Sequence, residues 1–387
     1  MNNKEQLFFE LIQVAIGTRI CLSHTPSADE WAELYAMAKK QSLVGVCFAG
    51  VQRLLQQRQE PPEMLYLTWM GMAAKIQQRN EVVSKVVGKV KEHYDKEGFD
   101  MVLLKGQGNL SNYPESIRML RTSGDIDAWI MPKGCAEMSL GERMKNDEIV
   151  LKHFWKKDPK IRHCYIHIHE NLFEGIDVEV HYRPSYINSA VKNARFQRWV
   201  AEEAPKQIVN MKVIPGAKDV HVAVPTAEFN VVYQLSHLYR HIFDDGLGLR
   251  QVIDYYFALQ SFKRECPQFD RELSVNALID KFGMKRFSQA LMYVLQSHLG
   301  LEEQYLLCEP DPEAGAFLLE EIMLAGNFGH YDERTKAATY ENGVQRLIRR
   351  QLRNMRFLGY YAEEVLSVPI YRVYQEYWRI KMNIKCK

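Results

Sequence analysis

The stretch GDIDAWIM, Gly124–Met131, has the pattern of a buried β-strand that carries two carboxylates at its start. Successive side chains of a strand point to opposite faces, so Asp125 and Asp127 share one face while Ile126 points to the other. Two carboxylates held this close repel each other unless a cation lies between them. Because hard oxygen ligands suit Mg²⁺, the pair favours a divalent metal site and phosphoryl or nucleotidyl transfer.

Just before this strand lies a second apolar run that ends in a glycine-containing turn. Phe99–Leu104 predicts a short buried strand, and Lys105-Gly106-Gln107-Gly108 predicts a turn that leads into a helix. Backbone N–H groups and a lysine ammonium at such a turn can bind the oxygens of a triphosphate. An ordinary tight turn is the alternative interpretation.

Cationic and hydroxyl side chains lie between the turn and the acidic strand. Arg118, Arg121 and Ser123 are placed to reach phosphate, and we favour Arg121 because it stands four residues before Asp125. A solvated helix end is the alternative for Arg118.

A third carboxylate is expected on a neighbouring strand. The segments 162–169 and 176–182 alternate in polarity and predict an antiparallel hairpin. On the second segment Asp177, Glu179 and His181 share one face. Glu179 lies at mid-strand, so we prefer it as third metal ligand and candidate general base, with Asp177 as the second choice. An ordinary exposed hairpin face is the alternative for both.

The remaining segments have helical patterns. Ser27–Glu30 forms a capping box, and Pro61-Pro62 suits the first turn of a helix that runs to about Tyr94. Apolar periodicity returns from Thr226 onward. The predicted fold class is therefore α+β, with a small mixed sheet flanked by N-terminal and C-terminal helical regions. The predicted parts are residues 1–95, an α/β core at 96–225 and a helical domain at 226–387.

Composition limits the classes of protein to consider. The formal net charge is +2, which gives no reason to expect DNA sequence recognition or a membrane partner. The seven cysteines are scattered without a CxxC pair, which argues against a disulfide framework and against a zinc finger. The sequence shows no signal peptide and no apolar run of the ~20 residues that span a bilayer. We therefore expect a cytoplasmic protein.

Five segments together resemble a known family. They are Lys105-Gly106, RTSGDIDAWI at 121–130, VEVHYRP at 178–184, LSHLYRH at 235–241 and GLRQVID at 248–254. They are similar to the uncharacterised bacterial nucleotidyltransferase family of the DNA polymerase beta-like superfamily. Gln107 stands where that superfamily has a second Gly or Ser, and the gap from Gly106 to Asp125 is longer than its pattern.

The resemblance implies a nucleotidyltransferase that uses an NTP and an unknown hydroxyl acceptor, either a small molecule, a protein or an RNA. It implies that Asp125, Asp127 and Glu179 hold Mg²⁺ or Mn²⁺. Lys105 and Gly106 would then face the nucleotide. We include the neighbouring Gln107, Arg121, Ser123 and Gly124 among the predicted nucleotide-binding residues.

Other patterns leave alternatives open. Gln107 motivates a non-catalytic nucleotide-binding module on the same fold. Arginines between Arg346 and Arg356, followed by many tyrosines, motivate an RNA-binding surface, although a solvated helix face is the commoner cause. His237 and His241 stand one helical turn apart without the glutamate of a zinc protease, so we expect them to hydrogen-bond within the helices or to line the cleft.

Overall fold

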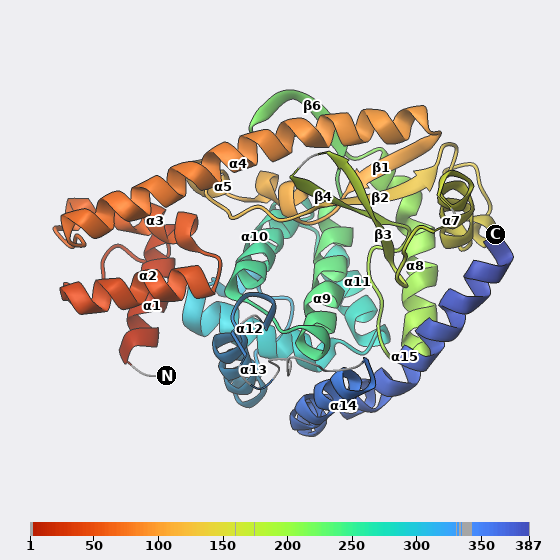
Figure 1. The fold of residues 1–387 in the computed structure, drawn as a ribbon. Helices are drawn as coiled ribbons and strands as arrows, with labels where there is room; N and C mark the ends of the chain where they lie inside the picture. The colour runs from red at the N-terminus through yellow and green to blue at the C-terminus, as the bar shows by residue number, and fades with distance from the viewer. Residues whose placement is uncertain are drawn as a thin grey trace.

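A six-stranded sheet lies at the centre of the fold, with helices on both faces (Figure 1). The computed structural model describes residues 3–158, 160–173, 175–329, 331–332, 334 and 343–386. The architecture is α+β, as the sequence predicts. The strands are β1 (Phe99–Leu103), β2 (Ile126–Pro132), β3 (His167–Phe173), β4 (Ile176–His181), β5 (Met211–Ile214) and β6 (Ala217–Ala223).

The sheet is mixed, in the order β3-β4-β2-β1-β6-β5. β2 pairs with β1 antiparallel and with β4 parallel. β3 is antiparallel to β4, β6 is parallel to β1, and β5 closes the other edge against β6. The acidic strand β2 therefore lies inside the sheet, where its register is fixed on both sides.

Four helices precede the sheet: α1 (Asn3–Ile16), α2 (Ala28–Lys40), α3 (Val44–Leu54) and α4 (Glu63–Lys96). The predicted capping box of α2 is present, because Ser27 accepts from the Glu30 N–H and Glu30 accepts from the Ser27 N–H. Pro62 precedes α4, as the sequence predicts. α4 has 34 residues and runs along the sheet (Figure 1).

One face of the sheet packs against α4 and α7 (Asn146–Lys157). The core on this side includes Ile126, Ala128 and Ile130 of β2, which follow the alternation read from the sequence. Each helix contributes apolar side chains from the face that it turns to the sheet, namely Val83, Val87 and Val90 of α4 and Val150, Leu151 and Phe154 of α7.

The opposite face of β2 carries Asp127, Trp129 and Met131 and packs against α8 (Ala190–Ile208), α9 (Ala227–Asp244) and α10 (Leu249–Glu265). Trp129 stacks on Phe229 of α9 with the ring centroids 5.7 Å apart, and Trp199 of α8 stacks on the other side of Phe229 at 4.7 Å. These aromatic pairs fix α8 and α9 on the face that also carries the carboxylates.

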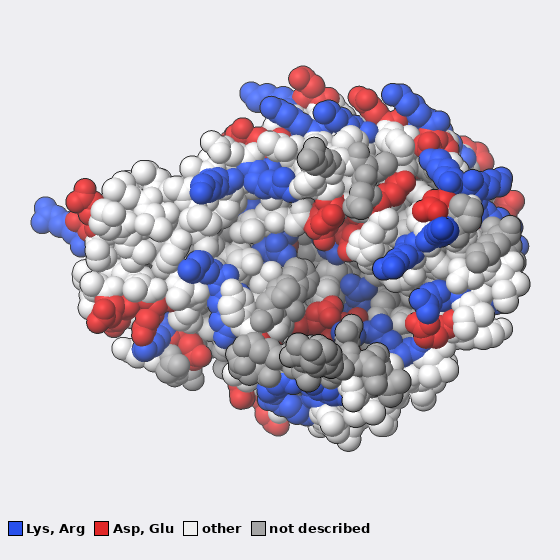
Figure 2. All heavy atoms as spheres, viewed as in Figure 1, with Lys and Arg blue, Asp and Glu red and all other residues white. Residues whose placement is uncertain are grey.

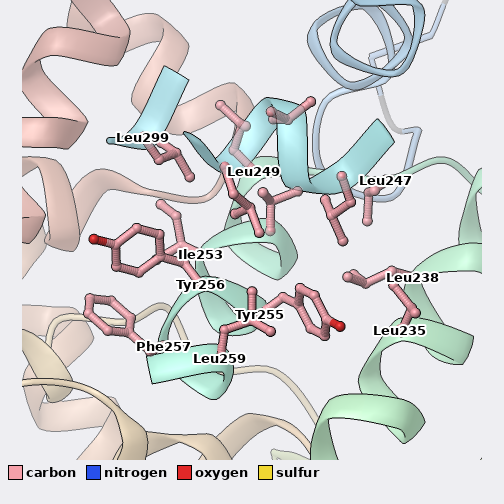
Figure 3. Packing of buried hydrophobic residues seen from close by; sticks show 14 of the residues in the cluster. Leu235, Leu238, Leu247, Leu249, Ile253, Tyr255, Tyr256, Phe257, Leu259 and Leu299 are labelled. Carbon is pink, nitrogen blue, oxygen red and sulfur yellow. The ribbon is translucent and has the colours of Figure 1, made fainter. Parts of the chain in front are cut away.

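α9 and α10 form the centre of the larger hydrophobic core, together with helices that follow them. Figure 3 shows Leu235 and Leu238 of α9 near Leu249 and Ile253 of α10, with Leu299 of α12 above them. The later helices are α11 (Phe269–Lys281), α12 (Lys285–Leu299), α13 (Pro312–Ala325), α14 (Gly343–Asn354) and α15 (Leu358–Cys386). In the described part of the chain, no helix is both long and apolar enough to cross a bilayer.

The structure differs from the sequence interpretation in the segments around the sheet. Between β2 and α7, residues 136–145 contain only the single helical turn α6 (Leu140–Arg143). The first hairpin strand begins at His167 rather than at Arg162. The strands β5 and β6 and the helix α8 were not anticipated. β5 is four residues long and half exposed, so its pattern is too short to distinguish it from a loop.

Candidate active site

The carboxylates of β2 and β4 meet because the two strands are parallel and in register. Asp127 lies directly opposite Glu179, and both side chains point to the face covered by α9. On the next strand, β3, His169 lies opposite Glu179. Three neighbouring strands therefore place a carboxylate, a second carboxylate and an imidazole in one row.

Two cationic or basic groups lie against this pair of carboxylates. The Lys105 ammonium is 2.9 Å from Asp127 Oδ1. His181 Nε2 is 3.0 Å from the same oxygen and 3.3 Å from Glu179 Oε2. Lys105 comes from the end of β1, so the turn after this strand brings its ammonium to the acidic strand, as the sequence suggests.

The electrostatics follow from this proximity. Burial tends to lower the pKa of His181, but its hydrogen bonds to Asp127 and Glu179 outweigh burial and raise it. For Glu179, burial would raise the pKa, but the His181 hydrogen bond and the Lys105 charge hold it well below the usual value. Burial and the neighbouring Glu179 and Asp127 raise the pKa of Asp125. The site therefore concentrates negative charge, and positive charge is drawn to it.

Asp125 stands apart from the most compact cluster. The metal-binding atoms of Asp127, Glu179 and His181 lie within 4.8 Å of one another, whereas Asp125 does not belong to that group. Asp125 is exposed and borders two hollows on either side of the strand start. Asp177 is also exposed and borders one of these two hollows, whereas Glu179 borders neither and instead lies 3.3 Å from His181 Nε2.

The predicted turn at residues 105–108 and the helix after it form a single 3₁₀ helix, η2 (Gly106–Asn112). Gly106 has φ +59°, a left-handed conformation that glycine adopts without strain, and it lines the cleft beside Asp125. The Gln107 side chain is buried on the other side and donates to Asn80 Oδ1 of α4 at 2.9 Å. Gln107 therefore leaves the cleft open, and only its backbone remains a candidate for contact with a nucleotide.

Arg121 is tied to α10. Its Nε and Nη2 each lie 2.6 Å from an oxygen of Asp254, and Tyr113 donates to the same carboxylate at 2.5 Å. On α10 itself, Arg250 lies one helical turn before Asp254. The two-point pair between Asp254 and Arg121 fixes the segment that leads to Asp125. Arg121 also lines the cleft beside Asp125, and its contact with a nucleotide stays a prediction.

The first hollow lies between the acidic strand and the two helices α9 and α10. It has a volume of about 80 Å³, and its walls include Lys105, Gly106, Asp125 and Asp127. From the helices it is lined by Gln234, His237, Leu238, Arg250, Gln251 and Asp254. The segments 235–241 and 248–254, which belong to the family resemblance, thus contribute to its far wall.

The second hollow lies on the other side of Asp125, beneath α4, and has a volume of about 310 Å³. Ser123, Gly124 and Asp125 line one side, and Lys75 and Arg79 of α4 line the other. Figure 2 shows acidic and basic side chains gathered around a hollow in the middle of the side of the molecule that faces the viewer. Lys75 and Arg79 stand one helical turn apart, so both cations face the same space.

Histidines surround the carboxylates. His167 and His169 of β3 have their Nε2 atoms 3.1 Å apart, and His167 Nδ1 is 3.5 Å from Glu179. His237 and His241 of α9 also have Nε2 atoms 3.1 Å apart, and His237 lines the first hollow. Both expectations for the α9 pair are met, since they hydrogen-bond within the helix and one of them lines the cleft.

One comparison with known proteins found a match. A model of a family described as uncharacterised nucleotidyltransferases matches residues 27–300. The chain belongs to this nucleotidyltransferase family. The match runs from the cap of α2 to the end of α12 and so contains α4, the whole sheet, α9 and α10. No curated protein and no solved structure matches the chain.

In this nucleotidyltransferase, the sequence interpretation missed three residues that border the site. The alternation along β4 already placed His181 on the face of Glu179, but that signal was not given a role. No local sequence pattern marks Lys75 and Arg79 as site residues, because their position beside Ser123 depends on how α4 crosses the sheet.

Proposed function

We propose that this nucleotidyltransferase has the polymerase beta-like core and transfers a nucleoside monophosphate from an NTP to a hydroxyl group, releasing pyrophosphate. The observation that carries the proposal is the in-register pair Asp127 and Glu179, with Asp125 at the start of the same strand. A glycine turn with Lys105 lies beside this pair.

The donor set suits a divalent metal ion. Asp125, Asp127 and Glu179 would hold Mg²⁺ or Mn²⁺ through carboxylate oxygens, which are the ligands these cations prefer. The fit rests on the accumulated carboxylates: burial and the neighbouring Glu179 and Asp127 raise the pKa of Asp125, and the Lys105 ammonium lies 2.9 Å from Asp127. When bound, the ion would neutralise the charge that develops on the transferred phosphate.

The surrounding residues have separate tasks in this proposal. Lys75 and Arg79 would bind the triphosphate oxygens in the hollow beneath α4, with Ser123 and Gly124 on the opposite wall. The acceptor oxygen attacks the α-phosphorus as the bond to the pyrophosphate oxygen breaks. Glu179, the candidate base, would receive the proton of the acceptor hydroxyl.

His181 acts as a positioning residue. Its Nε2 contacts both Asp127 and Glu179, so it holds the two carboxylates at a fixed separation. The ring itself is held from the other side, since Nδ1 is 3.3 Å from the Arg183 carbonyl oxygen.

A space for the acceptor exists on the same face of the sheet. A cavity of about 340 Å³ lies beyond Trp129, between β2, the start of α7 and α8. Its lining combines Trp129, Tyr165 and Met131 with the amides of Asn193 and Gln197. This mixture of aromatic and amide groups is typical of small-molecule sites, so we place a small-molecule acceptor there.

Two sets of contacts weaken the alternative functions, a non-catalytic nucleotide-binding module and an RNA-binding surface. Gln107 points away from the cleft, which removes the reason to infer a non-catalytic module. Arg353 donates to the Ile242 carbonyl, Arg350 pairs with Asp245, and Arg356 pairs with Glu321, so these arginines hold the helical domain together. The side chain of Arg346 lies outside the described residues.

The proposal is tested by incubating the protein with Mg²⁺, labelled NTPs and a panel of hydroxyl acceptors, and measuring label transfer and pyrophosphate. Asp125→Ala/Asp127→Ala should reduce transfer to background, because the metal loses two ligands. Equal transfer by wild type and the double variant would refute the assignment. Gln107→Ala is the matched control and should retain transfer if it remains folded.

A further inference from the structure

The last helix, α15, is apolar on two opposite faces. One face packs against the body of the protein through Val365, Val368, Tyr371, Trp378 and Met382, all of which are buried. The other face carries six large apolar side chains that are 56–77% exposed: Leu366, Ile370, Val373, Tyr377, Ile380 and Ile384. No described residue of the chain covers this second face, which we call the α15 stripe.

The spacing of the α15 stripe is regular. Its members follow one another at intervals of four, three, four, three and four residues. This is the a/d repeat of a coiled coil, with Leu366, Val373 and Ile380 at d and the other three at a. The buried residues of α15 fall at b, c and f, on the side away from the seam. A helix that only packed against its own protein would need the buried face alone.

The flanking charges indicate the partner and its direction. In this register Glu376 occupies a g position, and Lys381, five residues later, occupies the next e position. In a parallel coiled coil, each g residue lies beside the following e residue of the partner helix. Two copies of α15 would therefore form two ion pairs, each between Glu376 of one copy and Lys381 of the other. An antiparallel pair would instead bring like charges together across the seam.

The surroundings of the stripe permit this contact. α15 lies at the outer edge of the molecule, so another helix can approach its free face (Figure 1). Glu376 pairs with Arg379 at 2.6 Å, but both side chains are at least half exposed, so this pair can be exchanged for one across an interface. Five of the six stripe residues lie in the part of α15 that runs from Pro369 to the end of the helix.

We infer that the α15 stripe is a self-association surface, on which two copies of this chain pair in parallel through a short coiled coil. The inference rests on α15 alone and is independent of the proposed function. The seam from Leu366 to Ile384 covers fewer than three heptads, so the pairing is expected to be weak. The dimer should therefore depend on protein concentration.

Light scattering coupled to size-exclusion chromatography measures this directly. Wild type should shift from one chain mass toward two between about 1 μM and about 1 mM, the range of a weak specific complex. Val373→Asp and Ile380→Asp should remain monomeric over the same range. Val191→Asp replaces an equally exposed apolar residue on α8 and should still dimerise. Circular dichroism checks that each variant is folded.

Charge exchange tests the parallel arrangement. Glu376→Lys and Lys381→Glu should each weaken the dimer, the double exchange should restore it, and a mixture of the two single variants should form a heterodimer. Wild type that stays monomeric throughout would overturn the inference. A dimer that tolerates Val373→Asp, or a stripe-dependent binding of anionic vesicles by a monomer, would overturn it as well.

Discussion

Glu179 and Asp177 differ in a way that only their surroundings decide. Both lie on the same face of β4, but Glu179 is opposite Asp127 and contacts His181, whereas Asp177 is exposed at the rim of the hollow beneath α4. A carboxylate at the centre of the charge cluster can hold a metal ion and accept a proton, while one at the rim contributes only a screened charge.

Glu179→Gln is therefore expected to reduce nucleotide transfer by about 10²–10⁴-fold, the usual contribution of a general base. Asp177→Asn, which makes the same chemical change two residues earlier, should stay within a few-fold of wild type. Steady-state transfer rates of the two variants distinguish them. A larger loss for Asp177→Asn would exchange the roles of these two carboxylates.

Glu364 is a second carboxylate whose pKa is set by its surroundings in the fold. It is buried in α15 and accepts from the backbone and side-chain N–H groups of Asn188, at 2.7 and 3.0 Å. Burial raises its pKa from 4.5 to about 7, although these hydrogen bonds act in the opposite direction. The folded protein therefore binds a proton that the unfolded chain has already released.

The raised pKa of Glu364 determines how the stability of the protein changes with pH. Because the folded-state pKa is the higher one, the contribution of Glu364 to stability is complete below pH 4.5 and is lost as the pH rises to about 7. The loss is on the order of 3 kcal/mol for the free energy of unfolding. Thermal unfolding of Glu364→Gln between pH 5 and 8 should lack this decline, which wild type shows. Parallel curves for both proteins would contradict the assignment.

At the level of elements, helix α3 presses against the segment that leads to the acidic strand. Gly45 lies so close to this segment that a Cβ atom would stand 2.1 Å from the Leu120 carbonyl oxygen. Leu120 immediately precedes Arg121, which Asp254 holds in place. The close approach of α3 therefore helps to set where Asp125 begins its strand.

Gly45→Ala should consequently destabilise the protein by about 1–3 kcal/mol, as overpacking does, and should also weaken nucleotide binding. Gly71→Ala provides the matched control, since a Cβ there meets nothing within 4 Å and lies inside α4. It should instead gain about 0.5–1 kcal/mol from helix propensity. Chemical denaturation compares the two variants, and equal effects would argue against close packing at Gly45.

Across the whole molecule, the candidate site joins parts that are far apart in the sequence. Lys75 and Arg79 come from the N-terminal helices, the carboxylates from the sheet, and Arg250 with Gln251 from the helices that follow it. A nucleotide bound among them would stabilise these parts together, because a ligand that binds only the folded state raises its stability by mass action.

An NTP with Mg²⁺ at about 100 times its dissociation constant should thus add about 2.7 kcal/mol and raise the melting temperature. Excess EDTA should abolish most of this shift. Lys75→Ala/Arg79→Ala should reduce the shift, whereas Lys85→Ala/Lys89→Ala removes two exposed cations with the same spacing on α4 and should not. The proposed phosphate contacts would be wrong if both double variants behaved alike.

The sequence by itself determined the features that arise from local periodicity. The alternation along residues 125–131 gave Asp125 and Asp127 a common face, and the same rule placed Glu179 with His181. The caps and apolar spacing gave α2, α4, α9 and α10. These features depend on neighbours within a few residues, so they can be read directly from the chain.

Only the tertiary structure decided which of these faces meet. Strand register places Glu179 opposite Asp127, the packing of α4 turns Gln107 toward Asn80 and brings Lys75 beside Ser123, and Asp254 pairs with Arg121. Such pairings join residues tens of positions apart and depend on how helices cross the sheet. Local alternation therefore predicted the acidic strand, while long-range packing decided what surrounds it.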